Sequence, residues 1–471
     1  MVLYTPGRTS TYPDEPVKKG LRAFFLGGGD EVGNVGCILE DSTGTRLLID
    51  YGLAPTRPPK YPAEAPMIEH AIITHSHIDH RGMAPWLVGH MGTVLHGTPL
   101  TASVSQIMWS DTYKVSRIEG YPLAWDRRDM DEALQAWSTH QLGEWFEIGA
   151  WKCRFHRAGH IPGAVMVEIE TPELRILWSG DMDTRASPNA LGAVPVDCDV
   201  LFLEGTYGNR IHPPRVEEEE RLVRKVLEVA DRGGTALIPA FASGRGQDIL
   251  RILRREAPNL EVHYHGMGVG ITKHWMDHPE SVNDPRGLSK TWRWCRRVSG
   301  KSDRRKALDA NAIVCTSGML DGGPAIWYAN RLRHQGANAI LLTGYQAEGS
   351  GGRLLLDEGK LRIFGEVTPI DLEVEQFSLS NHGGQVELTS FARACSPRHV
   401  VIFHADEEGR EALEPLLTGE MKVHLPPNQT EIILECPPCA PEPLIGRTRH
   451  DAEYLGVSYG IMEKKVKKWK H

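Results

Sequence analysis

The chain has 471 residues, and 53 lysines and arginines against 61 aspartates and glutamates give it a formal charge of −8. This length suggests about two to four domains with a sizeable core. Its 41% hydrophobic and 24% charged residues are ordinary for a globular protein and exclude disordered, collagen-like and coiled-coil chains. No run approaches the ~20 apolar residues that span a bilayer, so we expect no membrane partner. The eight cysteines form no disulfide framework, which favours a cytoplasmic location.

In chain order, the first part of the sequence, 1–205, contains many short apolar or alternating runs separated by glycine and aspartate. Such runs are typical of strands. Two longer stretches, 100–114 and 129–139, have the pattern of helices. The expected strands are 21–26, 36–40, 46–50, 70–74, 165–169 and 175–179. Together these patterns predict a sheet-rich, layered domain with helices outside.

The rhythm changes at residue 206, where helical and strand patterns begin to alternate. The expected helices are 217–230, 247–255 and 326–333, and the expected strands are 235–239, 312–316 and 339–343. This alternation predicts an α/β domain with a parallel sheet over 206–370. Strand patterns return at 400–404 and 430–434 in a segment, 371–435, that we assign to the first domain. A Pro-rich and then basic tail, 436–471, holds the close pair Cys436 and Cys439, whose role stays open.

A cluster of metal-binding side chains follows the apolar run 71–74. Its members are His75, His77, Asp79 and His80. Imidazole nitrogens and carboxylate oxygens are ligands that zinc prefers, and a tight turn after a strand can aim them at two neighbouring ions. We therefore predict a metal site here. Downstream, His160 in a glycine-flanked turn and Asp181 after an apolar strand are candidates for the remaining ligands.

These residues, with Asp50 at the end of an earlier apolar run, occur in the order found in the metallo-β-lactamase fold, and the chain resembles that superfamily. The resemblance implies an α/β fold in which an αββα sandwich carries two zinc ions at its edge. It implies the following ligands: His75, His77 and His160 for one ion, Asp79 and His80 for the other, and Asp181 as the bridge. Asp50 would lie behind the ligands and orient them.

Later segments resemble the β-CASP nucleases, in which an α/β domain is inserted into the sandwich. Glu204 matches the acidic residue that opens the insertion, with Gly205 in place of the usual serine. Three glycine-rich segments also match: 239–247, 316–320 and 344–353. Glycine-rich turns let backbone N–H groups approach a phosphate, and Arg245 and Arg353 would add positive charge to bind RNA there.

Two histidines complete the resemblance. His382 matches the family's catalytic histidine, which Glu204 would hold, and His404 matches the final ligand of the second zinc site. Gly383-Gly384 replaces the usual small residue and aspartate, and Ala405-Asp406 replaces the usual Gly-Glu. RNA-directed members keep a histidine at the position of His404. The chain is therefore most similar to the RNA-cleaving members, which include the endonuclease subunit of cleavage and polyadenylation specificity factor.

A basic segment, 286–306, indicates a nucleic-acid partner independently of the resemblance. It holds nine lysines and arginines and one acid, with tryptophans interleaved. Basic side chains neutralise phosphates, and tryptophan rings stack on unpaired bases. We therefore expect Trp292, Arg293, Arg296 and Arg297 to contact RNA. The alternative is a solvated helix surface with the tryptophans in the core.

The function we predict is a zinc-dependent ribonuclease that acts on single-stranded RNA in 3′-end processing or decay. A metal-bound hydroxide would attack the phosphodiester, with Asp79, Glu204 and His382 as catalytic residues, and leave a 5′-phosphate and a 3′-hydroxyl. A small-molecule hydrolase of the same fold and a catalytically silent RNA-binding subunit are the alternatives. The sequence leaves open internal or 5′-to-3′ cleavage, and a homodimer or an RNA-processing complex as the assembly.

Overall fold

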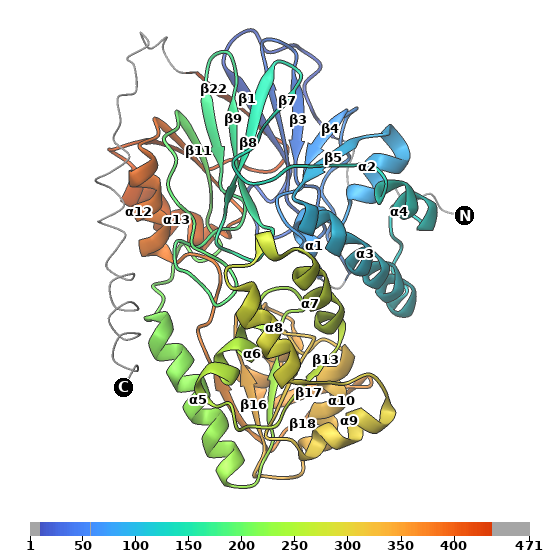
Figure 1. The fold of residues 1–471 in the computed structure, drawn as a ribbon. Helices are drawn as coiled ribbons and strands as arrows, with labels where there is room; N and C mark the ends of the chain where they lie inside the picture. The colour runs from blue at the N-terminus through green and yellow to red at the C-terminus, as the bar shows by residue number, and fades with distance from the viewer. Residues whose placement is uncertain (1–9, 57, 436–471) are drawn as a thin grey trace.

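The computed structural model describes residues 10–56 and 58–435, so the pair Cys436 and Cys439 lies outside the described residues. Two parts are stacked along the long axis of the molecule (Figure 1). One part is built on two sheets from the beginning and the end of the chain, and the other on a third sheet from the middle.

Each of the two sheets in the first part has seven strands. In spatial order, the first sheet consists of β22 (Glu431–Leu434), β1 (Leu21–Gly27), β2 (Gly36–Asp41), β3 (Arg46–Ile49), β4 (His70–Ile72), β5 (Val94–Gly97) and β6 (Trp137–Thr139). The second consists of β21 (Lys422–His424), β20 (His399–Phe403), β11 (Val200–Glu204), β10 (Arg175–Trp178), β9 (Val165–Glu170), β8 (Trp151–Arg157) and β7 (Trp145–Ile148). The last strands of the chain therefore return to both sheets.

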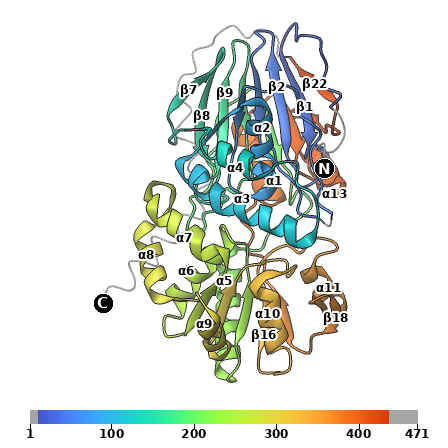
Figure 2. The same ribbon diagram turned by 90° about the vertical axis from the view of Figure 1, so that its right-hand side faces the viewer.

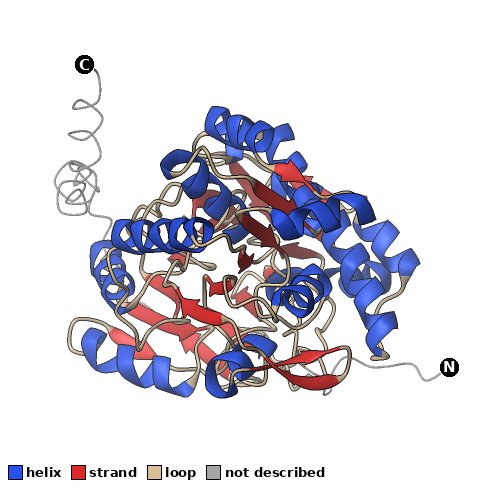
Figure 3. Cartoon of the chain, turned by 90° about the horizontal axis from the view of Figure 1, so that it is seen from below, coloured by secondary structure: helices blue, strands red, loops and turns tan. Residues whose placement is uncertain are grey.

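Apolar side chains fill the space between these two sheets. Successive side chains of a strand point to opposite faces, so Leu21 and Phe25 of β1 enter this core, whereas Phe24 and Leu26 pack beneath the outer helices. The helices over the first sheet are α2 (Ala84–Met91), α3 (Pro99–Glu119) and α4 (Arg127–Ala133), and those over the second are α12 (Gln385–Cys395) and α13 (Glu407–Leu417). Seen from below, the strands lie inside and the helices outside (Figure 3). The predicted αββα sandwich is confirmed.

The third sheet is parallel throughout, as the strand–helix alternation predicts. Its order is β14 (Arg296–Arg297), β13 (Val262–His265), β15 (Ala312–Cys315), β12 (Ala236–Pro239), β16 (Ala339–Leu342) and β19 (Glu373–Gln376). One face carries α5 (Arg215–Asp231), α6 (Arg245–Glu256) and α8 (Pro285–Trp294), and the other carries α10 (Gly323–Leu332) and α11 (Gly351–Glu358). Because β19 belongs to it, this sheet extends past residue 370, the end that we expected for the insertion.

Short elements complete the second part. They are α7 (Met267–Asp277), η1 (Pro279–Ser281), α9 (Lys301–Lys306), η2 (Ala307–Asp309) and the hairpin of β17 (Lys360–Ile363) and β18 (Glu366–Pro369). Helix α7 joins the two parts, because its Ile271 and Trp275 pack against Leu100 and Val104 of α3 (Figure 2). This apolar contact fixes the third sheet beneath the sandwich.

The helix predicted over 129–139 is wrong in its second half. Helix α4 ends at Ala133, and the chain continues into β6, which pairs in parallel with β5. Trp137 packs against the core beneath the first sheet's helices, and such tertiary contacts override a local helical pattern. Across 10–56 and 58–435, no helix is both long and apolar enough to cross a bilayer.

The predicted site residues gather where several strands end. Asp50 follows β3, His75 follows β4 by three residues, Glu204 ends β11 and His404 follows β20. Strands β3 and β4 are parallel, as are β10, β11 and β20, so their carboxyl ends meet at one edge of each sheet. The short helix α1 (Ile78–Arg81) begins at this edge, which faces the third-sheet part (Figure 1).

Candidate metal centre

Four side chains from three turns form one half of a His/Asp cluster. His75 and His77 lie before α1, His160 follows β8 and Asp181 follows β10. One ligand atom of each lies within 4.8 Å of the others. His160 Nε2 is 3.0 Å from His77 Nδ1, and His75 Nε2 is 3.4 Å from Asp181 Oδ2. These are the residues that the resemblance assigns to one ion and its bridge.

Asp79, His80 and His404 form the other half, again with ligand atoms within 4.8 Å of one another. His404 Nε2 is 3.4 Å from Asp79 Oδ2, and His80 Nε2 is 3.2 Å from Asp181 Oδ1. Asp181 therefore turns one oxygen towards each half. This is the arrangement that a bridging carboxylate requires.

Several atoms of the cluster lack partners within the described residues. His75 Nε2, His80 Nε2, His404 Nε2 and Asp181 Oδ1 are buried without a hydrogen bond. A buried polar group without a hydrogen bond costs ~1–3 kcal/mol, so four such atoms at one place are suited to bind a cation. Imidazole nitrogens with carboxylate oxygens are the donors that zinc and similar ions bind. The residues present therefore fit bound metal.

Asp50 lies behind the cluster and orients His80. Its Oδ2 is 2.8 Å from His80 Nδ1, and it accepts hydrogen bonds from the backbone N–H and the hydroxyl of Thr74 at 2.7 and 2.9 Å. A Cβ on Gly52 would lie 1.7 Å from the carbonyl oxygen of Asp79, so glycine is required where this loop meets the ligand turn. A carboxylate that holds one ring nitrogen leaves the other directed at the metal.

Burial keeps the rings of His75 and His160 in the form that binds metal. Burial lowers the pKa of His75 and of His160 well below the usual range, and neighbouring histidines add to the effect. Neutral imidazole is the metal ligand. For Asp181, burial acts to raise the pKa, but the facing histidines, His80 above all, hold that pKa well below its usual value. The carboxylate therefore stays ionised.

His382 lies beside the cluster and is held by Glu204. Its Nδ1 is 2.9 Å from Glu204 Oε1, and its Nε2 is 3.8 Å from Asp181 Oδ2. Glu204 also accepts hydrogen bonds from the backbone N–H groups of Met182 and Thr206 at 3.0 and 3.1 Å. Burial acts to lower the pKa of His382, but the carboxylates of Glu204 and Asp181 outweigh it and raise that pKa to about 9. An oriented, protonated imidazole at this place has the properties of a general acid.

Two departures from the family pattern compensate for one another. A Cβ on Gly205 would lie 2.7 Å from the Cβ of Ala405. Where the family has serine and glycine, this chain has glycine and alanine at the two facing positions. The packing volume between β11 and the turn after β20 is therefore retained.

A third departure, Gly383-Gly384, leaves His382 supported by other residues. A Cβ at Gly384 would lie 2.8 Å from the carbonyl oxygen of Arg210, so the chain passes too close for a side chain in this backbone geometry. The hydroxyl of Ser380 accepts the backbone N–H of His382 at 3.1 Å. Together with Glu204, this contact fixes His382 without an acid at position 384.

Among the residues predicted to contact RNA, Arg245 lies near the cluster. It begins α6, two residues after Ser243, whose carbonyl oxygen is 3.1 Å from His77 Nε2. Arg245 is 8% exposed, and within the described residues its Nε and Nη1 have no hydrogen-bond partner. Burial, assisted by the neighbouring Arg215, lowers the pKa of Arg245 to about 10. A buried guanidinium with unpaired N–H groups is suited to an anionic ligand.

The other predicted RNA contacts lie elsewhere. Arg353 is exposed on α11 and pairs with an aspartate of the same helix. Trp292 and Arg293 lie in α8, and Arg296 and Arg297 form β14, the edge strand of the third sheet. The Arg297 guanidinium covers the Trp292 ring at 4.9 Å. In the described part of the chain, none of the hydrogen bonds, ion pairs or ring contacts joins these residues to the cluster.

Sequence reasoning missed three residues that hold the ligands. His160 Nδ1 is 2.9 Å from the carbonyl oxygen of Asn381, and Thr206 Oγ1 is 3.0 Å from His404 Nδ1. Asn381 in turn donates from Nδ2 to Asp248 Oδ2 at 3.0 Å. Asn381 and Thr206 stand close to motif residues along the chain, and this proximity is the one signal that the sequence offers for them.

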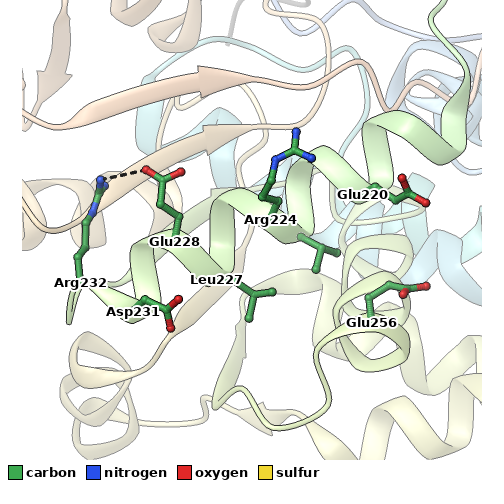
Figure 4. A pocket seen from close by; sticks show the side chains of 8 residues that line it. Glu220, Arg224, Leu227, Glu228, Asp231, Arg232 and Glu256 are labelled. Carbon is green, nitrogen blue, oxygen red and sulfur yellow. Dashed lines mark ion pairs between the residues drawn. The ribbon is translucent and has the colours of Figure 1, made fainter.

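A separate hollow lies on the outer side of α5 (Figure 4). Charged residues dominate its lining, which includes Glu220, Asp231 and Glu256, and Arg232 pairs with Glu228 at its end. It shares no residue with the cluster. The acidic side chains disfavour a phosphate ligand there, so the candidate site is the cluster and not the hollow.

Three family models match successive parts of the chain. Residues 28–210 match the metallo-beta-lactamase superfamily, residues 248–355 match the Beta-Casp domain, and residues 367–426 match the Zn-dependent metallo-hydrolase RNA specificity domain. The order of the models along the chain agrees with a sandwich that is interrupted by the third-sheet part and then resumed.

Curated relatives match over most of the chain. Probable RNase MJ4 from Methanocaldococcus jannaschii is 31% identical over 401 residues, which cover 82% of this chain and 94% of the relative. RNase aCSPSF2 from Saccharolobus solfataricus is 31% identical over 422 residues, 87% of this chain and 85% of the relative. Cleavage and polyadenylation specificity factor subunit 3 from Dictyostelium discoideum is 28% identical over 449 residues, 88% of this chain and 57% of the relative.

A solved structure agrees in fold. The crystal structure of a protein of unknown function from Enterococcus faecalis V583 has a TM-score of 0.57 to this chain at 13% identity, and the match covers 88% of this chain and 100% of that one. At this identity the likeness concerns the fold alone. The family models and the relatives add what the fold leaves open: the chain belongs to the metallo-β-lactamase superfamily, among the members that carry a Beta-Casp domain.

Proposed function

We propose that this protein is a ribonuclease that hydrolyses phosphodiester bonds of single-stranded RNA, in 3′-end processing or decay. The observation that carries the proposal is the Glu204–His382 pair, 2.9 Å apart, beside the His/Asp cluster. A ribose oxygen is a poor leaving group unless an acid protonates it, and this pair is an oriented acid. The names of the relatives RNase MJ4 and RNase aCSPSF2 support the same substrate class.

We assign two zinc ions to the cluster. One set of donors, His75, His77 and His160, lies together with Asp181. The second set, Asp79, His80 and His404, faces Asp181 Oδ1, which is 3.2 Å from His80 Nε2. When bound, zinc lowers the pKa of a coordinated water to ~7 and offsets negative charge on the reacting phosphate. The side chain of Asp79 is 22% exposed and orients the attacking water from the open side. His382 Nε2 gives its proton to the departing ribose O3′, which leaves a 3′-hydroxyl and a 5′-phosphate.

One RNA labelled at both ends tests this proposal, with zinc content measured on the same sample. We expect fragments with 5′-phosphate and 3′-hydroxyl ends, and the distribution of the two labels separates internal cleavage from 5′-to-3′ removal. RNA binding with zinc present but without cleavage would instead identify a silent RNA-binding subunit. Hydrolysis of small esters without RNA cleavage would identify a small-molecule hydrolase.

Replacing Arg245 with alanine should weaken RNA binding. We propose that its unpaired N–H groups bind a phosphate of the substrate, and hydrogen bonds to charged groups are worth ~1.5–3 kcal/mol. The expected result is a KM raised by about tenfold or more, with zinc content unchanged. An unchanged KM would show that Arg245 has a packing role only.

Replacing Arg293, Arg296 and Arg297 together with alanine tests the basic segment. We propose that long RNA extends from the cluster to this edge of the third sheet. Each lost phosphate contact lowers the slope of log affinity against log salt by ~0.7 for a single strand, so the triple variant should lower it by about 2. Arg117, Arg127 and Arg128, exposed on the sandwich, form the matched control triple. Equal slopes for the two triple variants would show that the basic segment is only a solvated surface.

We place this activity in the cytoplasm, where RNA is available and thiols stay reduced. The cysteines described by the structure support this: Cys37, Cys153, Cys198, Cys295, Cys315 and Cys395 are all free and buried. We also propose that the protein acts as a homodimer or within an RNA-processing complex. Size measurement of the purified protein with and without RNA separates the two.

A further inference from the structure

A path of aromatic rings leads from the surface to His382. Tyr207 follows β11 of the sandwich, and Tyr345 follows β16 of the third sheet. The Tyr207 ring centroid is 5.9 Å from that of His382 and 6.2 Å from that of Tyr345. Tyr207 is 7% exposed, whereas Tyr345 is 39% exposed. The path therefore begins at an open ring in one part of the molecule and ends at the proposed acid in the other.

The Arg210 guanidinium lies against both tyrosine rings of this path. Its guanidinium carbon lies 5.2 Å from the Tyr345 ring centroid and 5.6 Å from that of Tyr207. Its carbonyl oxygen accepts the backbone N–H of Gln385 at 2.8 Å, which ties Arg210 to the segment that carries His382. The side chain is exposed, so its remaining N–H groups face solvent beside an exposed ring.

Hydrogen bonds hold the turn that carries Tyr345, although the ring itself is partly exposed. Gln346 is buried and donates from Nε2 to the carbonyl oxygens of Gly318 and Gly344 at 3.2 and 3.3 Å. Gln376 donates to Gly344 as well, at 3.0 Å. A partly exposed ring whose backbone is held in this way is preorganised for a flat ligand.

We propose that Tyr345, with Arg210, stacks an unpaired RNA base next to the scissile phosphate. This inference rests on the proposed ribonuclease function and adds a subsite to it. Every base has a π face that an aromatic ring can cover, so stacking requires a single strand and no particular sequence. The guanidinium of Arg210 either covers the same base or meets the adjoining phosphate.

The test compares Tyr345 variants on two RNAs that have the same single cleavage site. One RNA is intact, and the other lacks one base beside the site, with each flanking position tried in turn. We expect Tyr345→Ala to raise KM by about 5- to 150-fold on intact RNA, the effect of losing one stacked base. On the abasic RNA that lacks the stacked base, the same substitution should raise KM far less. Tyr345→Phe should behave as wild type, and Tyr345→Leu, which keeps apolar packing without a ring, should behave as alanine.

Trp145 provides a matched control, because it is a 40% exposed ring under the Arg154 guanidinium at 4.3 Å on the edge strand β7. Trp145→Ala should leave KM unchanged. If wild type cleaves RNA but Tyr345→Ala has the same KM, the stacking site alone is overturned. The same holds if Tyr345→Ala raises KM equally on intact RNA and on abasic RNA at every position. Absence of RNA cleavage by wild type would overturn the proposed function as well.

Discussion

Replacing Asp181 with asparagine is expected to remove at least one zinc ion and RNA cleavage with it. The two oxygens of Asp181 face different halves of the cluster, 3.4 Å from His75 Nε2 and 3.2 Å from His80 Nε2. An amide is neutral and offers one acceptor oxygen, so it cannot replace a charged bridge between two cations. Loss of several kcal/mol of metal-ion stabilisation corresponds to a rate lower by about 10³-fold or more.

Metal analysis of the purified variant and single-turnover cleavage of a labelled RNA measure this effect. Asp231→Asn, at the end of α5 and outside the cluster, is the matched control and should keep both properties. Wild-type zinc content together with undiminished cleavage in Asp181→Asn would contradict the bridging role.

Replacing His382 with alanine should keep the zinc ions and the RNA affinity but lower the cleavage rate by ~10²–10⁴-fold, the usual contribution of a positioned acid. His382 Nε2 is 3.8 Å from Asp181 Oδ2, whereas its Nδ1 is engaged by Glu204 at 2.9 Å. A ligand can have the same geometry, because Asp50 holds His80 in this way and His160 Nε2 is 3.7 Å from Asp181 Oδ2, so the metal content of the variant decides between the two roles. Loss of a zinc ion in His382→Ala would therefore make it a ligand and require the roles of His382 and His404 to be exchanged. His334→Ala, an exposed histidine beyond α10, controls for the substitution.

Replacing Glu204 with glutamine should also lower the rate, by less than the loss of the ring itself. Glu204 is buried and accepts three hydrogen bonds, including the contact with His382. Because the two residues act as one unit, the double variant should be little worse than His382→Ala alone. Multiplied losses in the double variant would instead show that Glu204 acts separately, through the backbone groups of Met182 and Thr206.

Local sequence patterns were sufficient to predict most strands and helices and the types of metal-binding residue. The runs that become β1, β2 and β9 show the alternating or fully apolar pattern of a strand in the sequence itself. His75 to His80 follow an apolar strand within one turn, so their common direction is also local. The helix predicted over 129–139 failed where the pairing of β6 with β5 was decided by residues about 40 positions away.

What the sequence by itself determined is the fold class, the ligand types and the nuclease-like order of motifs, because these depend on residue identity and short-range period. The tertiary structure decided which residues meet. It brought Tyr345 to Tyr207 and Ser243, two residues before the buried Arg245, to His77, while it left Arg297 at the sheet edge. The first two are long-range contacts, and a local pattern of charges or rings is the same whether the segment faces a site or solvent. Only the packing of the third sheet beneath the sandwich distinguishes the two outcomes.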